Sequence, residues 1–193
     1  MKKHINKLSI KSVVFAMLAF NFSACTDHNH DDDHQNEEET INKIELTLTP
    51  DTLGLPPQTV VWSDLDGDGG NPPILPDTLR LGPTILYKAE LIFKYVHNGI
   101  EHSVNTEIRK EADEHLICFS PIQLIQVVIM EITRTDKDNM GKELGLTSIW
   151  KALIPEKGAV RVSLKHQPNG IKNGNCDLGE TDAEIDFPYT SIE

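Results

Sequence analysis

The residues best suited to chemistry lie near the N-terminus, in a stretch where histidines and carboxylates are interleaved. It contains His28, His30, His34, Asp31, Asp32 and Asp33. Neutral imidazole suits zinc and copper, and carboxylates add negative charge and oxygen ligands. A flexible chain can wrap such groups around an ion, but it must become ordered in doing so. Two interpretations stay open: a weak, unselective zinc or copper site, or a solvated acidic spacer whose histidines are incidental.

A second group of carboxylates occupies alternate positions at Asp64, Asp66 and Asp68, just before two glycines. This spacing resembles the first half of a calcium loop, in which side-chain oxygens converge on the ion. The twelfth position is Leu75 rather than a bidentate Glu, and no helical pattern flanks the loop, so an EF-hand is excluded. A looser calcium site with Asp77 as a further ligand and a plain Gly/Asp-rich turn remain as alternatives.

A third group lies at the predicted ends of strands. His115 precedes one strand and His166 ends another. The carboxylates near such ends are Glu111, Asp113, Glu114, Glu180 and Asp182. If these ends meet at one pole of the domain, they form a His/carboxylate metal site. The alternative is a set of solvated strand ends.

Catalytic patterns are weak throughout the sequence. No serine lies in a Gly-x-Ser-x-Gly elbow, and no glycine-rich loop introduces a helix for phosphates. Cys118 lies in an apolar run, where a thiol is usually inert. We therefore expect a protein that is not an enzyme and that has no catalytic residues.

The N-terminus has the order of a secretory signal. Residues 1–11 are basic, residues 12–20 are apolar, and small residues precede Cys25. The apolar run is too short to span a bilayer as a permanent helix. The end of this leader resembles a bacterial lipobox, although Phe22 stands where Leu is usual. The resemblance implies that residues 1–24 are removed and that Cys25 is acylated, which anchors the protein to a membrane.

Residues 25–40 are expected to form a disordered tether between this anchor and the folded domain. No apolar residue occurs between Thr26 and Thr40, so this stretch cannot contribute to a core. It resembles the acidic stretch that follows the lipidated Cys in some Gram-negative outer-membrane lipoproteins and directs them to the cell surface. We therefore expect an outer-membrane protein, with its periplasmic and cell-surface faces both open as locations.

Charge and cysteine content narrow the partners and the compartment. The formal net charge is −12, and such a surface repels nucleic acid and attracts cations. If Cys25 carries the anchor, Cys118 and Cys176 remain as a pair. In an oxidising compartment this pair either forms a disulfide or stays as two unrelated thiols.

Residues 41–193 show the short alternating runs and turn signals of an all-β domain. Strands are predicted at 44–48, 59–63, 78–81, 85–96, 100–108, 116–119, 124–132, 144–150, 158–166 and 183–187. For residues 121–133 a helix remains the alternative. The pattern favours an antiparallel, immunoglobulin-like β-sandwich of about nine strands, with a small barrel as its rival.

The clearest local prediction is a hairpin. Residues 85–96 alternate over twelve positions, and residues 100–108 alternate on the return. Asn98 and Gly99 tolerate the positive φ angles of a type I′ turn. We expect two long antiparallel strands joined at this turn.

Four segments carry a wider resemblance. They are Trp-Ser-Asp-Leu-Asp-Gly-Asp-Gly-Gly at 62–70, Glu-Ala-Asp-Glu-His at 111–115, Asp-Lys-Asp-Asn at 136–139 and Lys-His-Gln-Pro-Asn-Gly at 165–170. With the tether, they resemble a group of small Gram-negative outer-membrane lipoproteins of obscure function. The resemblance implies a secreted, lipid-anchored binding domain and carries no known activity.

Two functional hypotheses follow. The first is a non-enzymatic, lipid-anchored envelope protein that binds zinc or copper on its tether for uptake or sequestration, with an outer-membrane transporter as partner. The second is a cell-surface adhesion or glycan-binding accessory protein with a surface ligand, in which calcium at residues 64–68 is structural. Metal binding that disappears with the tether separates the first hypothesis from the second.

Overall fold

Alternating burial along the strands divides the folded chain into two sheets with a core between them. The computed structural model describes residues 40–67, 69–122 and 129–191. In β1 (Lys43–Pro50), Ile44, Leu46 and Leu48 are buried while the residues between them are partly exposed. Successive strand residues point to opposite faces, so this pattern places one face of the sheet on a core and the other in water.

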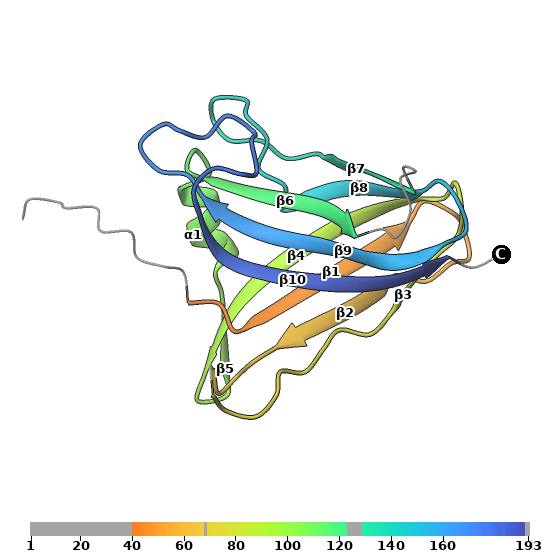
Figure 1. The fold of residues 1–193 in the computed structure, drawn as a ribbon, viewed down its shortest axis with the longest axis horizontal. Coiled ribbons are helices and arrows are strands. Elements are labelled where there is room, and N and C mark those ends of the chain that lie inside the picture. The colour runs from red at the N-terminus through yellow and green to blue at the C-terminus, as the bar shows by residue number, and fades with distance from the viewer. Residues whose placement is uncertain (1–39, 68, 123–128, 192–193) are drawn as a thin grey trace, which may run out of the picture. The chain divides into compact units, whose positions relative to one another are not determined.

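The described residues form ten strands and one short helix (Figure 1). After β1 they are β2 (Gln58–Ser63), β3 (Leu79–Leu81), β4 (Leu86–His97), β5 (Ile100–Ser103), α1 (Asn105–Lys110), β6 (His115–Ile122), β7 (Met130–Arg134), β8 (Thr147–Ala152), β9 (Lys157–His166) and β10 (Glu180–Ser191). The larger sheet has the order β2-β1-β4-β8-β7, with β5 also paired to β4. The smaller sheet has the order β3-β10-β9-β6.

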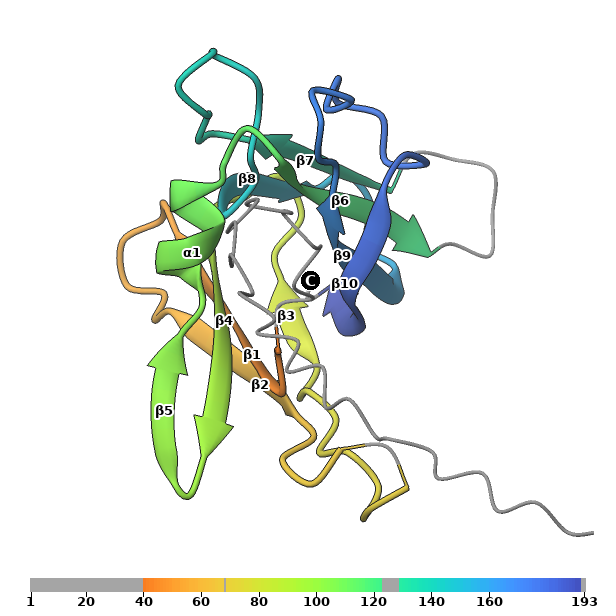
Figure 2. The same cartoon turned by 90° about the vertical axis from the view of Figure 1, so that its left-hand side faces the viewer.

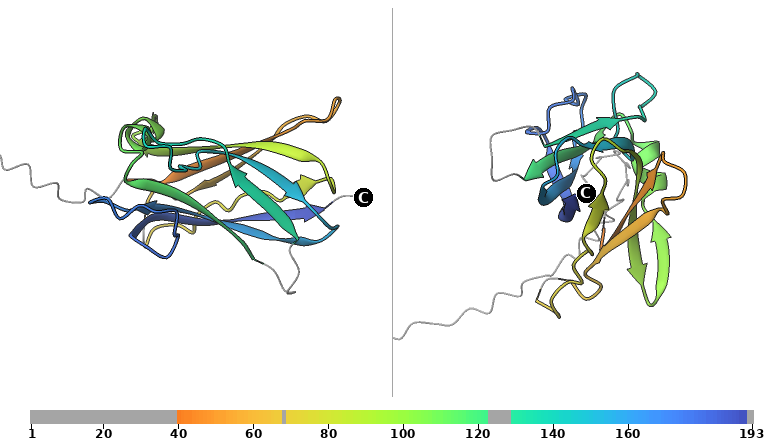
Figure 3. Two further views of the ribbon diagram at one scale, coloured as in Figure 1. Left: turned by 90° about the horizontal axis from the view of Figure 1, so that it is seen from above. Right: turned by 90° about the vertical axis from the view of Figure 1, so that its right-hand side faces the viewer.

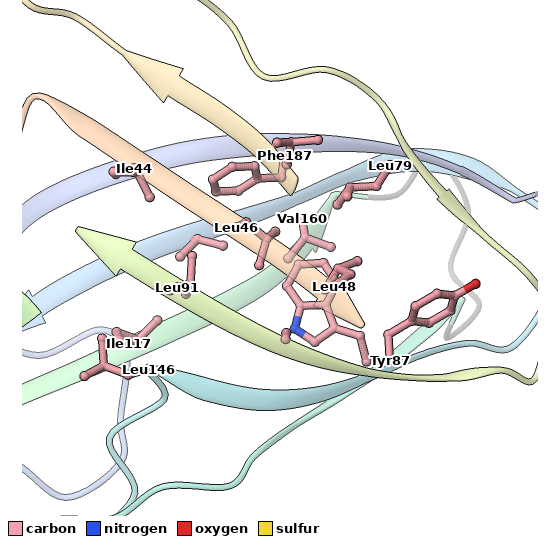
Figure 4. Close-up of a cluster of buried hydrophobic side chains, with 14 of the residues drawn as sticks. Ile44, Leu46, Leu48, Leu79, Tyr87, Leu91, Ile117, Leu146, Val160 and Phe187 are labelled. Carbon is pink, nitrogen blue, oxygen red and sulfur yellow. The ribbon is translucent and has the colours of Figure 1, made fainter. Parts of the chain in front are cut away.

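The two sheets face each other (Figure 3), and a hydrophobic cluster joins their inner faces (Figure 4). Leu46 and Leu91 come from the larger sheet, and Val160 and Phe187 come from the smaller one. Trp150 on β8 is fully buried, and its indole N–H donates to Ser148 Oγ over 2.9 Å. The expectation of an all-β domain is therefore confirmed, and the described residues form ten strands where about nine were predicted. The immunoglobulin-like arrangement stays a prediction.

The smaller sheet departs from a purely antiparallel arrangement at one edge. β3 runs parallel to the end of β10, with Leu79 opposite Tyr189 and Leu81 opposite Ser191. Ser191 Oγ donates to the Leu81 carbonyl oxygen over 3.0 Å. A parallel pair requires a long crossover between its strands, and these two are separated by most of the domain.

The predicted hairpin is correct at its turn and wrong at its return. Asn98 and Gly99 have φ angles of 51° and 76°, as the type I′ turn requires. The returning strand ends at Ser103, and α1 replaces the rest of the predicted 100–108 strand (Figure 2). Ile108 is the buried residue of this helix, and its neighbours along the helix are exposed.

The side chain of Asn105 explains this break. Its Oδ1 accepts a hydrogen bond from the Phe93 N–H over 2.9 Å, and its Nδ2 donates to the Leu91 carbonyl oxygen over 2.8 Å. An amide side chain thus satisfies the β4 backbone where a paired strand would otherwise be needed. The main chain is released from the sheet at this point and turns into α1.

The predicted strand at 144–150 begins later than expected, because residues 144–146 cross between the two sheets. The Leu144 carbonyl accepts from the Ile117 N–H over 2.7 Å, and the Leu146 carbonyl accepts from the Leu91 N–H over 3.0 Å. Gly145, with a φ of +105°, passes so close to Ile117 that an added Cβ would lie 3.0 Å from its carbonyl oxygen. Only glycine fits this crossing without strain.

Several predictions concern residues outside the described part of the chain. The leader, the tether apart from Thr40, and residues 124–128 of the predicted 124–132 strand belong to this group. Within the described ranges, no helix is long and apolar enough to cross a membrane.

Candidate functional site

The structure gathers the predicted histidine group at one end of the smaller sheet. The imidazole rings of His115 and His166 stack with their centroids 5.0 Å apart and their planes 14° from parallel. His115 Nε2 lies 3.8 Å from Asp182 Oδ2, and His166 Nε2 lies 3.4 Å from Glu114 Oε2. We call these four residues the histidine pole.

Strand register brings the histidine pole together. His115 begins β6 and lies opposite His166 at the end of β9, which in turn lies opposite Glu180 on β10. The register between β9 and β10 shifts between Thr181 and Ala183, so Asp182 is the extra residue of a β-bulge. A bulge re-aims a side chain, and this one carries the Asp182 carboxylate beside His115, where its side chain is only 2% exposed.

Burial controls the proton affinity of His115, whose side chain is 1% exposed. Desolvation lowers the pKa of His115 below its ordinary value, because the charged imidazolium loses its hydration. The Glu111 carbonyl oxygen, 3.1 Å from Nδ1, opposes this effect and raises the pKa, while the nearby His166 lowers it. His115 is therefore neutral at pH 7 and donates its Nδ1–H to the Glu111 carbonyl.

The arrangement does not amount to a metal centre. Among the described residues, no group of three or more His, Cys, Asp or Glu side chains is placed to hold an ion. The two imidazoles stack face to face, and the His115 Nδ1 is directed to a backbone carbonyl. The strand ends that carry His115 and His166 therefore meet, which was the condition of the metal-site hypothesis, and their side chains form paired imidazole–carboxylate contacts.

The first predicted metal group, at residues 28–34, is outside the described residues. In the second group, Asp64 and Asp66 accept hydrogen bonds from their own loop. His28, His30, His34 and Asp31–Asp33 precede the described ranges, as does Cys25, and Asp68 is also outside them. Asp64 Oδ1 accepts from the Gly67 N–H over 3.0 Å. Asp66 Oδ2 accepts from the Asn71 backbone over 2.9 Å and from its side chain over 2.6 Å, and these bonds lower the pKa of Asp66.

A buried ion pair next to the histidine pole was missed by sequence reasoning. Lys172 Nζ lies 3.0 Å from Asp138 Oδ2, and both side chains are fully buried. Lys172 also donates to the Ala112 carbonyl over 2.7 Å, just after α1. The sequence marks residues 136–143 and 167–174 only as turns, and nothing in either segment indicates that they pair.

The hydrogen bonds around Asp138 fix its charge state. Burial alone raises the pKa of Asp138, but the bond from Lys172 and the backbone N–H of Lys142 outweigh it and leave the pKa below its ordinary value. The other oxygen accepts from the N–H groups of Met140 and Lys142 over 2.9 and 2.8 Å. The carboxylate is therefore ionised and is fully hydrogen-bonded in a buried position.

A disulfide secures the loop that carries Lys172. Cys118 on β6 and Cys176 are bonded, with their Cα atoms 5.8 Å apart and a sequence separation of 58. Of the two alternatives for this cysteine pair, the structure has the bonded one. Gln167, which is fully buried, holds the same loop by donating to the carbonyls of Asn175 and Leu178 over 2.7 and 2.9 Å.

A separate cavity of about 180 Å³ lies at the edge of the two sheets, away from the histidine pole. Trp62 on β2 and Ile185 on β10 line it, together with Leu75 and Pro76 from the segment that leads to β3. Its charged wall consists of Arg161, Glu184 and Asp186. Sequence reasoning singled out Trp62 only as part of a motif and did not place it near these charges.

Comparison with known proteins adds no assignment to this geometry. No family model, no curated protein and no solved structure matches the chain.

Proposed function

We propose that the chain is a non-enzymatic, lipid-anchored protein of the outer membrane, whose β domain is held away from the bilayer by the tether. The observation that carries this proposal is the Cys118–Cys176 disulfide. Structural disulfides persist in oxidising compartments such as the bacterial periplasm and the cell surface. This agrees with a leader, residues 1–24, that is removed before Cys25 and delivers the domain outside the cytoplasm.

The anchor is tested at Cys25. Mass spectrometry of the protein extracted from membranes should show a chain that begins at Cys25 and carries acyl groups. A Cys25→Ser variant should be recovered in the soluble fraction, because the remaining chain has no lipid to hold it. Membrane association of this variant equal to that of the wild type contradicts the anchor.

The proposed activity is capture of zinc or copper by His28, His30 and His34 together with Asp31, Asp32 and Asp33, for uptake or sequestration with an outer-membrane transporter. These residues offer imidazole nitrogens and carboxylate oxygens on a short segment. Isothermal titration calorimetry with zinc and with copper tests this proposal. It uses the chain without residues 1–24, which we call the secreted chain. The matched variant replaces the three histidines by alanine and leaves the acidic residues in place.

The expected result is binding by the parent chain that is lost in the triple variant. Equal heats from both chains would place the metal on the β domain instead, and no heat from either would refute metal capture. Adding His115→Phe to the parent chain should leave the titration unchanged, because the described residues hold no metal group.

A second candidate function is a cell-surface adhesion or glycan-binding accessory protein with an immunoglobulin-like sandwich. The cavity beside Trp62 favours it, because it combines an aromatic side chain with charged hydrogen-bonding groups. In this candidate, calcium at residues 64–68 has only a structural role. Deleting residues 26–40 should abolish metal capture but leave glycan binding intact.

A further inference from the structure

We infer that the cavity beside Trp62 is a subsite for one neutral pyranose ring of a glycan. This inference rests on the second candidate function, glycan binding, and assigns it to particular residues. Trp62 is a half-buried aromatic residue on the edge strand β2. The second tryptophan, Trp150, is fully buried in the core.

The apolar part of the cavity suits the carbon face of a sugar ring. Trp62, Leu75, Pro76 and Ile185 bring an indole and aliphatic side chains to its wall. Pyranose rings present C–H groups on one face and hydroxyls around the rim, so an aromatic ring can cover the face while polar groups meet the rim. Tryptophan is suited to such sites because its body is apolar and its N–H remains a donor.

The charged wall is already arranged before any ligand binds. Arg161 Nε and Nη2 donate to the two oxygens of Asp186 over 2.7 and 3.0 Å. Arg161 Nη1 lies 3.3 Å from Glu184 Oε1, while Ser163 Oγ donates to Glu184 Oε2 over 2.9 Å. These contacts restrict the rotamers of all three charged side chains, which lowers the entropy lost on binding.

The wall retains capacity for hydroxyl groups. A carboxylate oxygen can accept more than one hydrogen bond, and a guanidinium carries five N–H donors, more than these contacts use. The side chains of Arg161, Glu184 and Asp186 are each a little over two-fifths exposed. A ligand in the cavity can therefore reach them. Hydroxyls both donate and accept, and they can therefore bond to Arg161, Glu184 and Asp186.

The charge pattern selects against anionic ligands. Arg161 contacts both Glu184 and Asp186, so the wall has two carboxylates and one guanidinium. Their excess of negative charge repels a carboxylate or phosphate. A neutral, hydroxyl-rich ligand avoids this repulsion.

The edge position explains why this cavity exists. β3 covers β10 only at residues Tyr189, Thr190 and Ser191, so the edge of β10 around Ile185 is not paired by β3. Between β2 and β3, Ser63 at the end of β2 forms an isolated antiparallel bridge to Ile74. The chain therefore turns back beside β2 just before Leu75. The β2–β3 segment runs along the lower side of the sheets in Figure 1 and contributes Leu75 and Pro76 to the cavity.

Tryptophan fluorescence of the secreted chain tests the subsite. The chain is titrated with the methyl glycosides of glucose, galactose, mannose and N-acetylglucosamine, with methyl glucuronide as an anionic probe. We expect a saturable change in emission with at least one neutral glycoside and none with methyl glucuronide. Trp150 remains in a Trp62→Phe variant as an internal reporter of folding.

Matched variants locate the response. Trp62→Ala should weaken binding by calorimetry about tenfold or more, while Trp62→Phe should retain part of it. Glu184→Gln should also weaken it, and Lys88→Ala, in a different cavity on the outer face of the larger sheet, should not. No saturable response to any neutral glycoside, or an equal response to methyl glucuronide, overturns the subsite.

A glycan array of the secreted chain separates this inference from the function on which it rests. Array binding that Trp62→Ala abolishes supports both. Array binding that Trp62→Ala leaves unchanged upholds a glycan-binding protein but overturns the subsite at Trp62.

Discussion

Asp182 Oδ2 lies 3.8 Å from His115 Nε2, and a β-bulge is the reason. This distance is too long for a hydrogen bond, and the contact becomes an ion pair only if His115 is protonated. The ring of His166 on β9 stacks on the ring of His115 on β6. Glu114 Oε2 lies 3.4 Å from His166 Nε2. Within the histidine pole, burial and the neighbouring His166 both lower the pKa of His115.

Acidification should weaken the fold through His115. Its pKa in the folded state is depressed by burial, so its contribution to stability is full above the ordinary histidine pKa and is lost as pH falls toward the folded-state pKa. Urea unfolding of the secreted chain at about pH 7.5 and about pH 5 measures this loss. His115→Phe should lose less stability over this interval than the wild type.

The control for this experiment is His102→Gln, which alters an exposed histidine on β5. It should follow the wild-type pH dependence, because its exposed side chain makes no contact with the histidine pole. If His115→Phe and the wild type lose the same stability on acidification, the histidine pole is not the source of the effect.

The buried pair of Lys172 and Asp138 should be essential for stability. Lys172→Met leaves the Asp138 carboxylate buried without its cation, and such a change costs about 3–5 kcal/mol. The free energy of unfolding in urea measures it. Lys110→Met, at a mostly exposed lysine, is the control and should change stability by about 0.5 kcal/mol or less.

A double variant separates the ion pair from packing. Lys172→Met combined with Asp138→Asn removes both charges, so it should recover part of the stability that Lys172→Met loses. No recovery would show that the cost comes from the Ala112 hydrogen bond and the packing of the lysine stem.

Reduction of Cys118–Cys176 should destabilise the domain by about 2–4 kcal/mol, because the bond restricts a long loop in the unfolded chain. Unfolding midpoints with and without dithiothreitol measure this difference. A variant with both residues changed to alanine should resemble the reduced wild type and should not respond to the reductant. A reductant-sensitive double variant would point to an effect unrelated to this bond.

Asn105→Ala should cost about 1–3 kcal/mol, because it leaves the Phe93 N–H and the Leu91 carbonyl without their partner. Amide hydrogen exchange at Phe93 should accelerate in the variant, which locates the damage on β4. Asn139→Ala alters an exposed turn asparagine and serves as the control. Equal stability of the two variants would mean that Asn105 does not hold the strand.

The sequence by itself determined the features that depend on local pattern. Period-two alternation identified β1, β4, β9 and β10, since one face of each strand meets the core. Asn98 and Gly99 identified their turn because few other residues accept its positive φ angles. The leader ending at Cys25 and the acidic tether are likewise matters of composition, and they remain predictions outside the described residues.

The tertiary structure alone decided which distant groups meet. Asn105 ends β5 because its amide reaches the backbone of β4, and no local pattern distinguishes this from a continuing strand. Lys172 and Asp138 are ordinary turn residues in sequence, and only the folded loops make them a buried pair. Register and a single bulge placed Asp182 against His115, because side-chain direction in a sheet reverses with a shift of one residue.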